Sequence, residues 1–214
     1  MVTGRCILVR NPALHPGDIR VVNAVDRLGL RHLKDVVVFP QTGARPLANM
    51  CSGGDLDGDD YLVMWDKDLL PKVVNPEPMD YSPPAPKISH GPVTSSDVIQ
   101  FFCDYMKNDA LGTIAVAHRA WADRSDLGVM DPSCLQLAQL HSEAVDYPKT
   151  GVPAVLTEDL RVKQYPHWCE KPPHMTYKSK KIVGQLYDQV KRVEFKPEYQ
   201  QSFDPRILLS LIHI

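Results

Sequence analysis

The sequence contains little that would direct the protein to a membrane, to an oxidising compartment or to nucleic acid by net charge alone. No apolar run approaches the roughly 20 residues that a membrane-spanning helix needs. The five cysteines are scattered and form no Cys-x-x-Cys pair, which argues against a disulfide framework and a zinc knuckle. Lysine and arginine number 24 against 26 acidic residues, and the net charge of −2 gives no general attraction to a polyanion. We therefore expect an intracellular protein with no membrane partner.

Short β-branched runs dominate the first seventy residues. They are separated by turn-forming stretches such as "HPGD" and "TGARP", and no ten-residue stretch shows a helical period. The pattern predicts four strands, over residues 5–10, 19–25, 35–40 and 61–65. We expect them to form a barrel or a sandwich rather than an α/β sheet.

Proline marks the end of this β region, because seven of the 19 prolines lie within residues 71–92. Proline lacks the amide donor and fixes φ, so this segment is expected to be an extended linker. Helical patterns follow over residues 94–109, 110–124, 131–148 and 179–193. The sequence thus predicts an α+β protein.

Local signals within the helical patterns predict where some helices begin and what they bury. Ser96 is the predicted N-cap of the first helix, and Asp131 followed by Pro132 is predicted to begin the third. Phe101 and Trp121 lie among apolar neighbours, so we expect both to be core residues.

Aspartate is concentrated in one short stretch, "CSGGDLDGDDYLVMWD", at residues 51–66. Asp55, Asp57 and Asp59 alternate along the chain, so their side chains can project to one side of an extended or tightly looped backbone. Three carboxylates at one point repel one another, and a divalent cation removes that cost. All-oxygen ligation suits Mg²⁺ or Mn²⁺. The three aspartates are therefore the candidate metal ligands.

Three other interpretations of this stretch remain open from the residues alone. A calcium EF-hand loop would need glycine at the position of Asp60, and Pro71 would cut its second helix short. A phosphatase of the haloacid-dehalogenase type has its nucleophilic aspartate after an apolar strand, whereas here the apolar strand follows the aspartates. An acidic surface turn explains the composition but not the strand that begins directly beside it.

The acidic stretch resembles the Asp-x-Asp-Gly-Asp loop of the two-barrel RNA polymerases, and it is most similar to that loop in the eukaryotic, RNA-silencing RNA-dependent RNA polymerases. Further blocks resemble the same family in the same order: "LVRNPALHPGDIRVV", "LKDVVVFPQTGARP", "ADRSDLGVMDPSCLQLA", "LHSEAVDYPKTG" and "TYKSKKIVGQLY". Together the blocks cover most of residues 5–190. The resemblance implies an RNA-directed RNA polymerase, a nucleotidyltransferase that makes double-stranded RNA for gene silencing.

The resemblance also implies a domain plan. Residues 1–70 would be part of the second of two double-psi β-barrels and carry the metal-binding loop. Residues 71–92 would be the proline-rich linker, and residues 93–214 a mostly helical region that is cut at its C-terminal end. The first barrel would precede Met1, so we expect a fragment that is inactive alone.

The resemblance implies roles for individual residues. Asp55, Asp57 and Asp59 would be the catalytic residues of a two-metal mechanism with Mg²⁺, or Mn²⁺ as the alternative. The residues themselves offer six candidate contacts to nucleotide or RNA: Arg10, His15, Arg45, Gly53, Gly54 and Lys149. Arg45 and Lys149 are among them because each lies in a glycine-containing loop from which a cation can reach phosphate. The "VRNP" block with Arg10 is similar to an arginine block that faces the ribose in DNA-dependent enzymes.

Three of these residues also have a structural interpretation. Arg10 suits a pair with a surface acid, His15 suits a bond to backbone groups, and Lys149 suits a salt bridge to Asp146. The expected partners are a single-stranded RNA template and ribonucleoside triphosphates, with small-RNA silencing proteins as further candidates. The expected location is the nucleus, the cytoplasm or both.

Two alternatives lie close to this interpretation. A DNA-templated two-barrel polymerase usually carries "NADFDGD", whereas Gly53 and Gly54 stand here where that pattern has Asn-Ala. A non-catalytic remnant or scaffold of the same fold would have no need of the three aspartates, which are intact.

Overall fold

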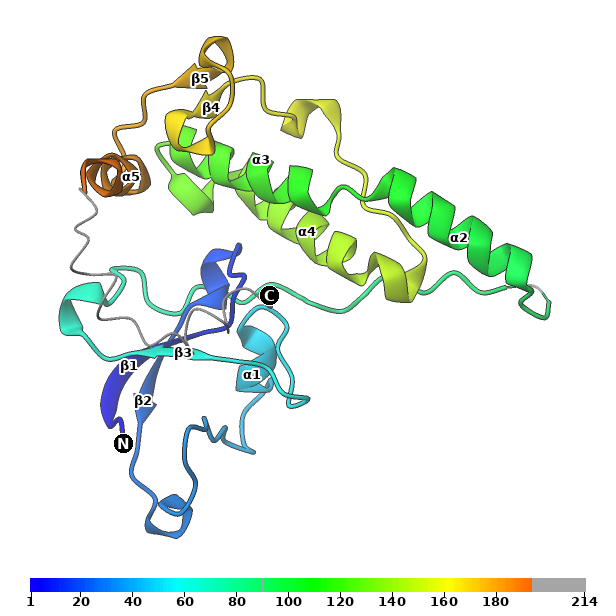
Figure 1. Cartoon of the computed structure of the whole chain (residues 1–214). Helices are drawn as coiled ribbons and strands as arrows, with labels where there is room; N and C mark the ends of the chain where they lie inside the picture. Colours follow the sequence, from blue (N-terminus) through cyan, green and yellow to red (C-terminus); the bar gives the residue numbers. More distant parts are fainter. Residues whose placement is uncertain (90, 194–214) are drawn as a thin grey trace, which may run out of the picture. The chain divides into compact units, whose positions relative to one another are not determined.

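The computed structural model describes residues 1–89 and 91–193. The chain divides into two compact units, Met1–Lys163 and Gln164–Ile214. The first unit holds a small sheet and the longest helices, and the described part of the second holds a short strand pair and an α-helix (Figure 1). The part of the predicted helical region beyond residue 193 lies outside the described residues. The α+β class is confirmed.

Three antiparallel strands form the sheet of the first unit. The order is β2 (Arg20–Ala24), β1 (Gly4–Val9) and β3 (Leu62–Met64), with β1 in the centre. Cys6 pairs with Val22 on one side, and Leu8 pairs with Val63 on the other. The four residues from Cys6 to Val9 are all buried, and because successive side chains of a strand point to opposite faces, both faces of β1 are covered there. Three of the four predicted strands are thus confirmed.

The fourth predicted strand, residues 35–40, is wrong, because this segment forms no helix or strand. The side chains of Val36 and Val38 are 58% and 53% exposed, so the β-branched run has no face packed on a core. A strand gains its stability from a neighbouring backbone and a packed face, and this run has neither in the described residues.

The proline-rich segment contains no helix or strand among its described residues, 71–89 and 91–92, and its first part lies against β2. The Asn75 side chain pairs with the Val21 backbone in both directions, at 2.7 and 3.0 Å. The Arg20 guanidinium donates to the carbonyl of Pro76 at 2.7 Å. These bonds satisfy backbone groups at the sheet edge that would otherwise need water. The linker is therefore part of the packed unit.

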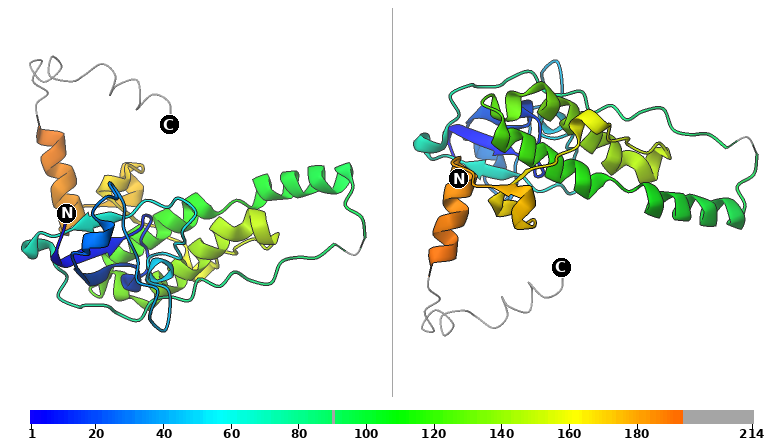
Figure 2. Two further views of the ribbon diagram at one scale, coloured as in Figure 1. Left: turned by 90° about the horizontal axis from the view of Figure 1, so that it is seen from below. Right: turned by 90° about the horizontal axis from the view of Figure 1, so that it is seen from above.

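The helices of the first unit are the single-turn α1 (Leu47–Met50) and the longer α2 (Ser95–Asn108), α3 (Leu111–Arg124) and α4 (Pro132–Thr150). Helices α3 and α4 lie side by side in every view (Figures 1 and 2). Ile114 and Leu137 are fully buried between them, and Trp121 packs against this core. Helix α2 has no buried residue. Phe101, predicted to be core, is 39% exposed.

Local capping explains where the helices begin. The predicted N-cap Ser96 is wrong, because Thr94 caps α2: its hydroxyl accepts from the Asp97 N–H, and the Asp97 carboxylate accepts from the Thr94 N–H. This reciprocal pair is a capping box, which satisfies two orphan donors at once. Asp131 with Pro132 begins α4 as predicted.

The second unit contains β4 (Tyr165–Pro166), the parallel β5 (Thr176–Tyr177) and α5 (Ile182–Arg192), which confirms the helix predicted over residues 179–193. The His167 ring lies 3.1 Å from the Asp188 carboxylate and accepts from the Ser179 N–H, so α5 is fastened to the strand pair. No helix in the described part of either unit has the length and apolar character to cross a bilayer.

Candidate metal centre

The acidic loop connects α1 to β3. After α1 the chain turns twice, with the Gly53 N–H donating to the Asn49 carbonyl and the Gly54 N–H donating to that of Cys51. Cys51 is fully buried and anchors the turn in the unit. The aspartates that follow lie at the surface, and the chain then enters β3. A buried turn on one side and a strand on the other therefore hold both ends of the loop.

The loop brings Asp55, Asp57 and Asp59 together as the alternating pattern predicts. One carboxylate oxygen from each lies within 4.8 Å of the others. The Asp57 N–H donates to Asp55 Oδ1 at 3.0 Å, and the Asp55 N–H donates to Asp59 Oδ2 at 3.0 Å. These backbone bonds fold the loop so that the carboxylates converge. Three oxygen donors at the surface fit a hexacoordinate Mg²⁺ or Mn²⁺, which would keep positions for water and phosphate.

Arg10 joins the acidic loop to the end of β1. Its Nε lies 2.8 Å from Asp59 Oδ2, and its Nη1 donates to the Ser52 carbonyl at 3.2 Å. In return, the Ser52 hydroxyl donates to the Arg10 carbonyl at 2.9 Å. The sequence suggested a pair with an acidic residue as the structural role of Arg10. That pair is present, and its acidic residue is Asp59, one of the three aspartates.

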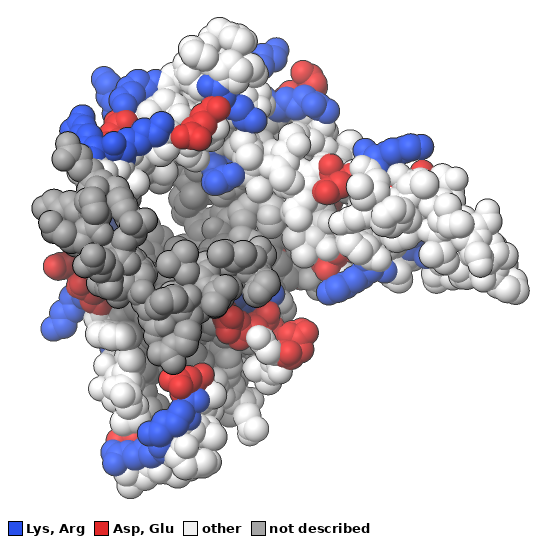
Figure 3. All heavy atoms as spheres, viewed as in Figure 1, with Lys and Arg blue, Asp and Glu red and all other residues white. Residues whose placement is uncertain are grey.

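The aspartates have different electrostatic environments. The hydrogen bond with Arg10, followed by the backbone bond from Asp55, holds the pKa of Asp59 below its usual value. The side-chain hydrogen bond with Asp55, followed by the charges of Asp55 and Asp59, raises the pKa of Asp57. On the face shown in Figure 3, both acidic and basic side chains occur among the described residues, and neither sign covers the visible surface.

The two glycines before the aspartates leave room for large neighbours. Gly53 has a φ of +68°, and a Cβ on it would lie 2.8 Å from the Tyr81 ring. A Cβ on Gly54 would meet the Tyr61 hydroxyl and would lie 2.9 Å from Arg10 Cδ. Both positions therefore require glycine for the loop itself. Their contact with a nucleotide stays a prediction.

A hollow of about 260 Å³ lies over the aspartates. Six of the predicted site residues line it: Arg10, Gly53, Asp55, Asp57, Asp59 and Lys149. Gly54, His15 and Arg45 are not among its lining residues. Opposite the acidic loop, the wall is one face of α4.

Lys149 forms the salt bridge that the sequence suggested as its structural role. Its Nζ lies 3.7 Å from Asp146 Oδ1, yet its side chain is 81% exposed, so this pair contributes little stability. The charge of Lys149 also acts on Asp57, whose pKa it lowers against the larger opposing effects. A cation therefore faces the carboxylates from α4.

His15 and Arg45 have structural partners. His15 Nδ1 accepts from the Gly17 N–H at 3.0 Å and caps a single turn, as its backbone-bonding interpretation predicted. Arg45 donates to the Asn49 side chain and to the Met79 carbonyl, each at 2.7 Å, and so fastens the linker to α1. Contact of either residue with RNA stays a prediction.

Sequence reasoning missed a polar group at the back of the hollow. Asp18 is 1% exposed, and its carboxylate accepts from the Leu14 and His15 N–H groups and from the Tyr81 hydroxyl. Asp18 and Tyr81 are 63 positions apart, and no local pattern connects them.

Sequence reasoning also missed the polar residues that α4 contributes. His141 and Ser142 line the hollow, one helical turn after Ala138 and one before Val145. The spacing of three and four residues that continues to Lys149 is the signal that would have found this face.

Known proteins are similar to this chain over most of its length. The family model described as RNA dependent RNA polymerase matches residues 1–190. RNA-dependent RNA polymerase 1 of Arabidopsis thaliana is 49% identical over 191 residues, which are 89% of this chain and 17% of that protein. RNA-dependent RNA polymerase 1 of Schizosaccharomyces pombe is 41% identical over 210 residues, covering 96% of this chain and 17% of that protein.

A solved structure is similar as well. The RNA dependent RNA polymerase QDE-1 from Thielavia terrestris aligns with a TM-score of 0.57 and 27% identity, over 75% of this chain and 19% of that chain. This chain therefore spans less than a fifth of the length of these three proteins.

Proposed function

The chain belongs to the RNA-dependent RNA polymerase family, and on that premise we propose that it carries the catalytic metal centre of an RNA-templated RNA polymerase. The observation that supports this most directly is the convergence of Asp55, Asp57 and Asp59 within 4.8 Å, at the mouth of a hollow that a lysine also faces. The product would be double-stranded RNA for gene silencing. The DNA-templated and scaffold alternatives are less consistent with the family match and the intact aspartates.

In the proposed reaction, a 3′-hydroxyl attacks the α-phosphorus of a ribonucleoside triphosphate, and the bond to the departing pyrophosphate breaks. When bound, Mg²⁺ or Mn²⁺ would neutralise phosphate charge and activate the hydroxyl. Asp55, Asp57 and Asp59 would hold the metal. Arg10 would fix the orientation of Asp59 through their 2.8 Å pair, and Lys149 would approach phosphate from α4.

The proposed domain plan follows the predicted one. Residues 1–70 would be part of a double-psi barrel, residues 71–92 the linker, and residues 93–214 a helical region. The proposed partners are single-stranded RNA, ribonucleoside triphosphates and small-RNA silencing proteins, in the nucleus or the cytoplasm. Because the relatives are several times longer, the cleft would be completed by parts that resemble the rest of their chains.

The function is tested by incorporation of labelled ribonucleotide on single-stranded RNA. The enzyme is a polymerase of the relatives' full length that carries this segment. We expect incorporation that requires Mg²⁺ or Mn²⁺ and that prefers RNA to DNA as template. Metal-independent incorporation, or equal use of a DNA template, would contradict the proposal.

Replacing Arg10 with alanine is expected to weaken discrimination between ribonucleotides and deoxyribonucleotides roughly tenfold or more, because a charge-assisted hydrogen bond to the ribose would be lost. The measurement is the ratio of kcat/KM for the two nucleotides. Arg5→Ala is the matched control, since Arg5 lies on the same strand and is exposed. Unchanged discrimination in Arg10→Ala would restrict Arg10 to its pair with Asp59.

A further inference from the structure

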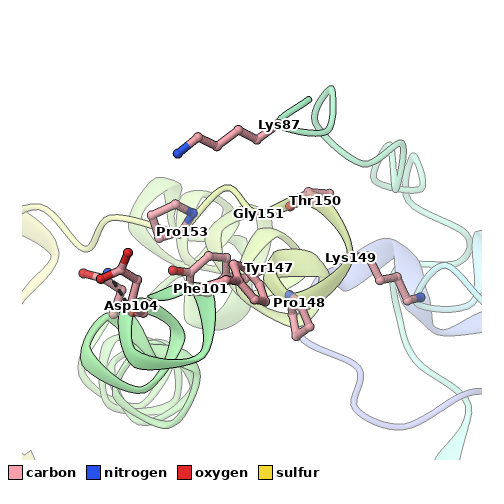
Figure 4. A pocket seen from close by; sticks show the side chains of 10 residues that line it. Lys87, Phe101, Asp104, Tyr147, Pro148, Lys149, Thr150, Gly151 and Pro153 are labelled. Carbon is pink, nitrogen blue, oxygen red and sulfur yellow. Dashed lines mark hydrogen bonds between the residues drawn. The ribbon is translucent and has the colours of Figure 1, made fainter. Parts of the chain in front are cut away.

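A second hollow, of about 380 Å³, lies beside the C-terminal end of α4 (Figure 4). Its wall comes from three segments that are far apart in the sequence: the linker contributes Lys87, α2 contributes Phe101 and Asp104, and α4 contributes Tyr147 and Lys149. The function predicted for the acidic loop gives no role to Lys87, Phe101, Asp104 or Tyr147. Both hollows lie within the first unit.

The aromatic side of this hollow offers an accessible ring. Phe101 is 39% exposed and meets Tyr147 edge to face, with ring centroids 6.1 Å apart. Tyr147 is 4% exposed and also contacts Tyr105, at 5.4 Å. Contact with the buried Tyr147 ring therefore fixes the position of the Phe101 ring. An aromatic ring that is both supported and accessible can stack on a nucleobase.

The opposite side carries a lysine whose backbone is fixed. The Lys87 N–H donates to the Thr150 carbonyl at 2.7 Å, while the Gly151 N–H donates to that of Tyr147 at 2.8 Å. The carbonyls of Thr150 and Tyr147, at the end of α4, therefore already have backbone donors. They do not need a hydrogen bond from a lysine side chain. Among the described residues, the Lys87 ammonium has no ion pair, and Figure 4 shows its side chain across the hollow from Phe101 and Tyr147.

Lys149 lines both hollows, and so they adjoin along α4. The second hollow presents an aromatic face, the ammonium group of Lys87 and the carboxylate of Asp104, while the side chain of Lys149, at its edge, points away from Phe101 (Figure 4). These groups match the base, the phosphate and the hydroxyl or amino groups of a ribonucleotide. A peptide ligand would make less use of an aromatic ring with a lysine placed across from it.

We propose that the second hollow holds one nucleotide of a single-stranded RNA that continues past Lys149 to the aspartates, with the base stacked on Phe101 and a phosphate at Lys87. The proposal deepens the proposed function and rests on it. Lys149 would contact the phosphate between the two sites, so the strand would be held at a defined distance from the metal centre.

The test measures binding of a fluorescent single-stranded oligoribonucleotide to the 214-residue chain by anisotropy, without divalent metal. Phe101→Ala is expected to raise Kd about fivefold or more, the usual loss for one stacked base. Phe102→Ala is the matched control, because Phe102 is 61% exposed on the same helix and does not line the hollow. Circular dichroism checks that both variants fold.

Lys87→Ala gives an independent readout. The slope of log K against log salt is expected to become shallower by about 0.7, the value for one phosphate contact on a single strand. Phe101→Ala should leave that slope unchanged. Lys72→Ala is the control, since Lys72 is an exposed lysine of the same linker that lies outside the hollow.

Equal affinities for Phe101→Ala and Phe102→Ala, or no RNA binding by the wild-type chain, would overturn the proposal. Binding of a peptide but not of RNA would assign the hollow to a protein partner and would also overturn it. The proposed function is judged separately, by metal-dependent incorporation and its loss in Asp57→Ala. The RNA-binding site in the second hollow can therefore be disproved while the polymerase function stands.

Discussion

Replacing Asp57 with alanine is expected to reduce nucleotide incorporation by about 10²- to 10³-fold or more, the usual effect of removing one preorganised electrostatic group from an active site. Asp57 lies between Asp55 and Asp59 in the sequence, and one oxygen of each converges within 4.8 Å. Without its carboxylate, two ligands would remain, and the metal would lose both affinity and a fixed position. The measurement is kcat in the polymerase of full length at saturating Mg²⁺.

The loss of incorporation in Asp57→Ala is expected to come from the missing metal ligand and not from a change in folding. The Asp57 side chain is exposed, and the bond from its N–H to Asp55 survives in alanine. Thermal unfolding should therefore change little. Asp60→Ala is the matched control, because Asp60 is an exposed neighbour outside the converging set. Near-normal activity of Asp57→Ala, or an equal loss in Asp60→Ala, would show that the three carboxylates are not the catalytic ligands.

The second large effect concerns stability in acid. His118 on α3 is 4% exposed, and burial lowers the pKa of its imidazole to about 4, against a weaker opposing contribution from its hydrogen bond with the Leu14 backbone. The charges of His141, Arg119 and His15 lower this pKa further. An unfolded histidine has a pKa near 6.5, so the unfolded chain binds the proton first as the pH falls. The stability from the neutral imidazole is complete above pH 6.5 and is lost between pH 6.5 and about 4.

His118→Gln should remove this contribution, which amounts to roughly 3 kcal/mol of unfolding free energy over that interval. Chemical unfolding at pH 7 and pH 4.5, followed by helical circular dichroism, would measure it. The variant should lose less stability than the wild type on acidification. His32→Gln is the control, because His32 is exposed. Parallel losses in the wild type and His118→Gln would mean that His118 is not buried in its neutral form.

Features with a local signal were predictable from the sequence. The alternation of Asp55, Asp57 and Asp59 was sufficient to predict their convergence, since the bonds that fold the loop span only two and four residues. Asp131 and Pro132 likewise marked the start of α4. The capping box of Thr94 and Asp97 was equally local, and the prediction of Ser96 overlooked the reciprocal pattern.

Features that depend on distant segments were not predictable. Residues 35–40 have a strand composition but no neighbouring strand to pair with. Tyr81, from the linker, supports both Gly53 and Asp18. The α4 wall of the candidate metal centre depends on how the helices pack near the acidic loop, and single-sequence patterns contain no information on that arrangement.

Direct measurement of metal binding gives the sharpest test of the site. The 214-residue chain is titrated with Mn²⁺, free Mn²⁺ is followed by electron paramagnetic resonance, and Mg²⁺ is then added as competitor. We expect saturable binding that Mg²⁺ displaces, that Asp57→Asn abolishes and that Asp60→Asn leaves intact. Binding that survives in Asp57→Asn, or none in the wild type, would contradict the assignment of a divalent cation to Asp55, Asp57 and Asp59.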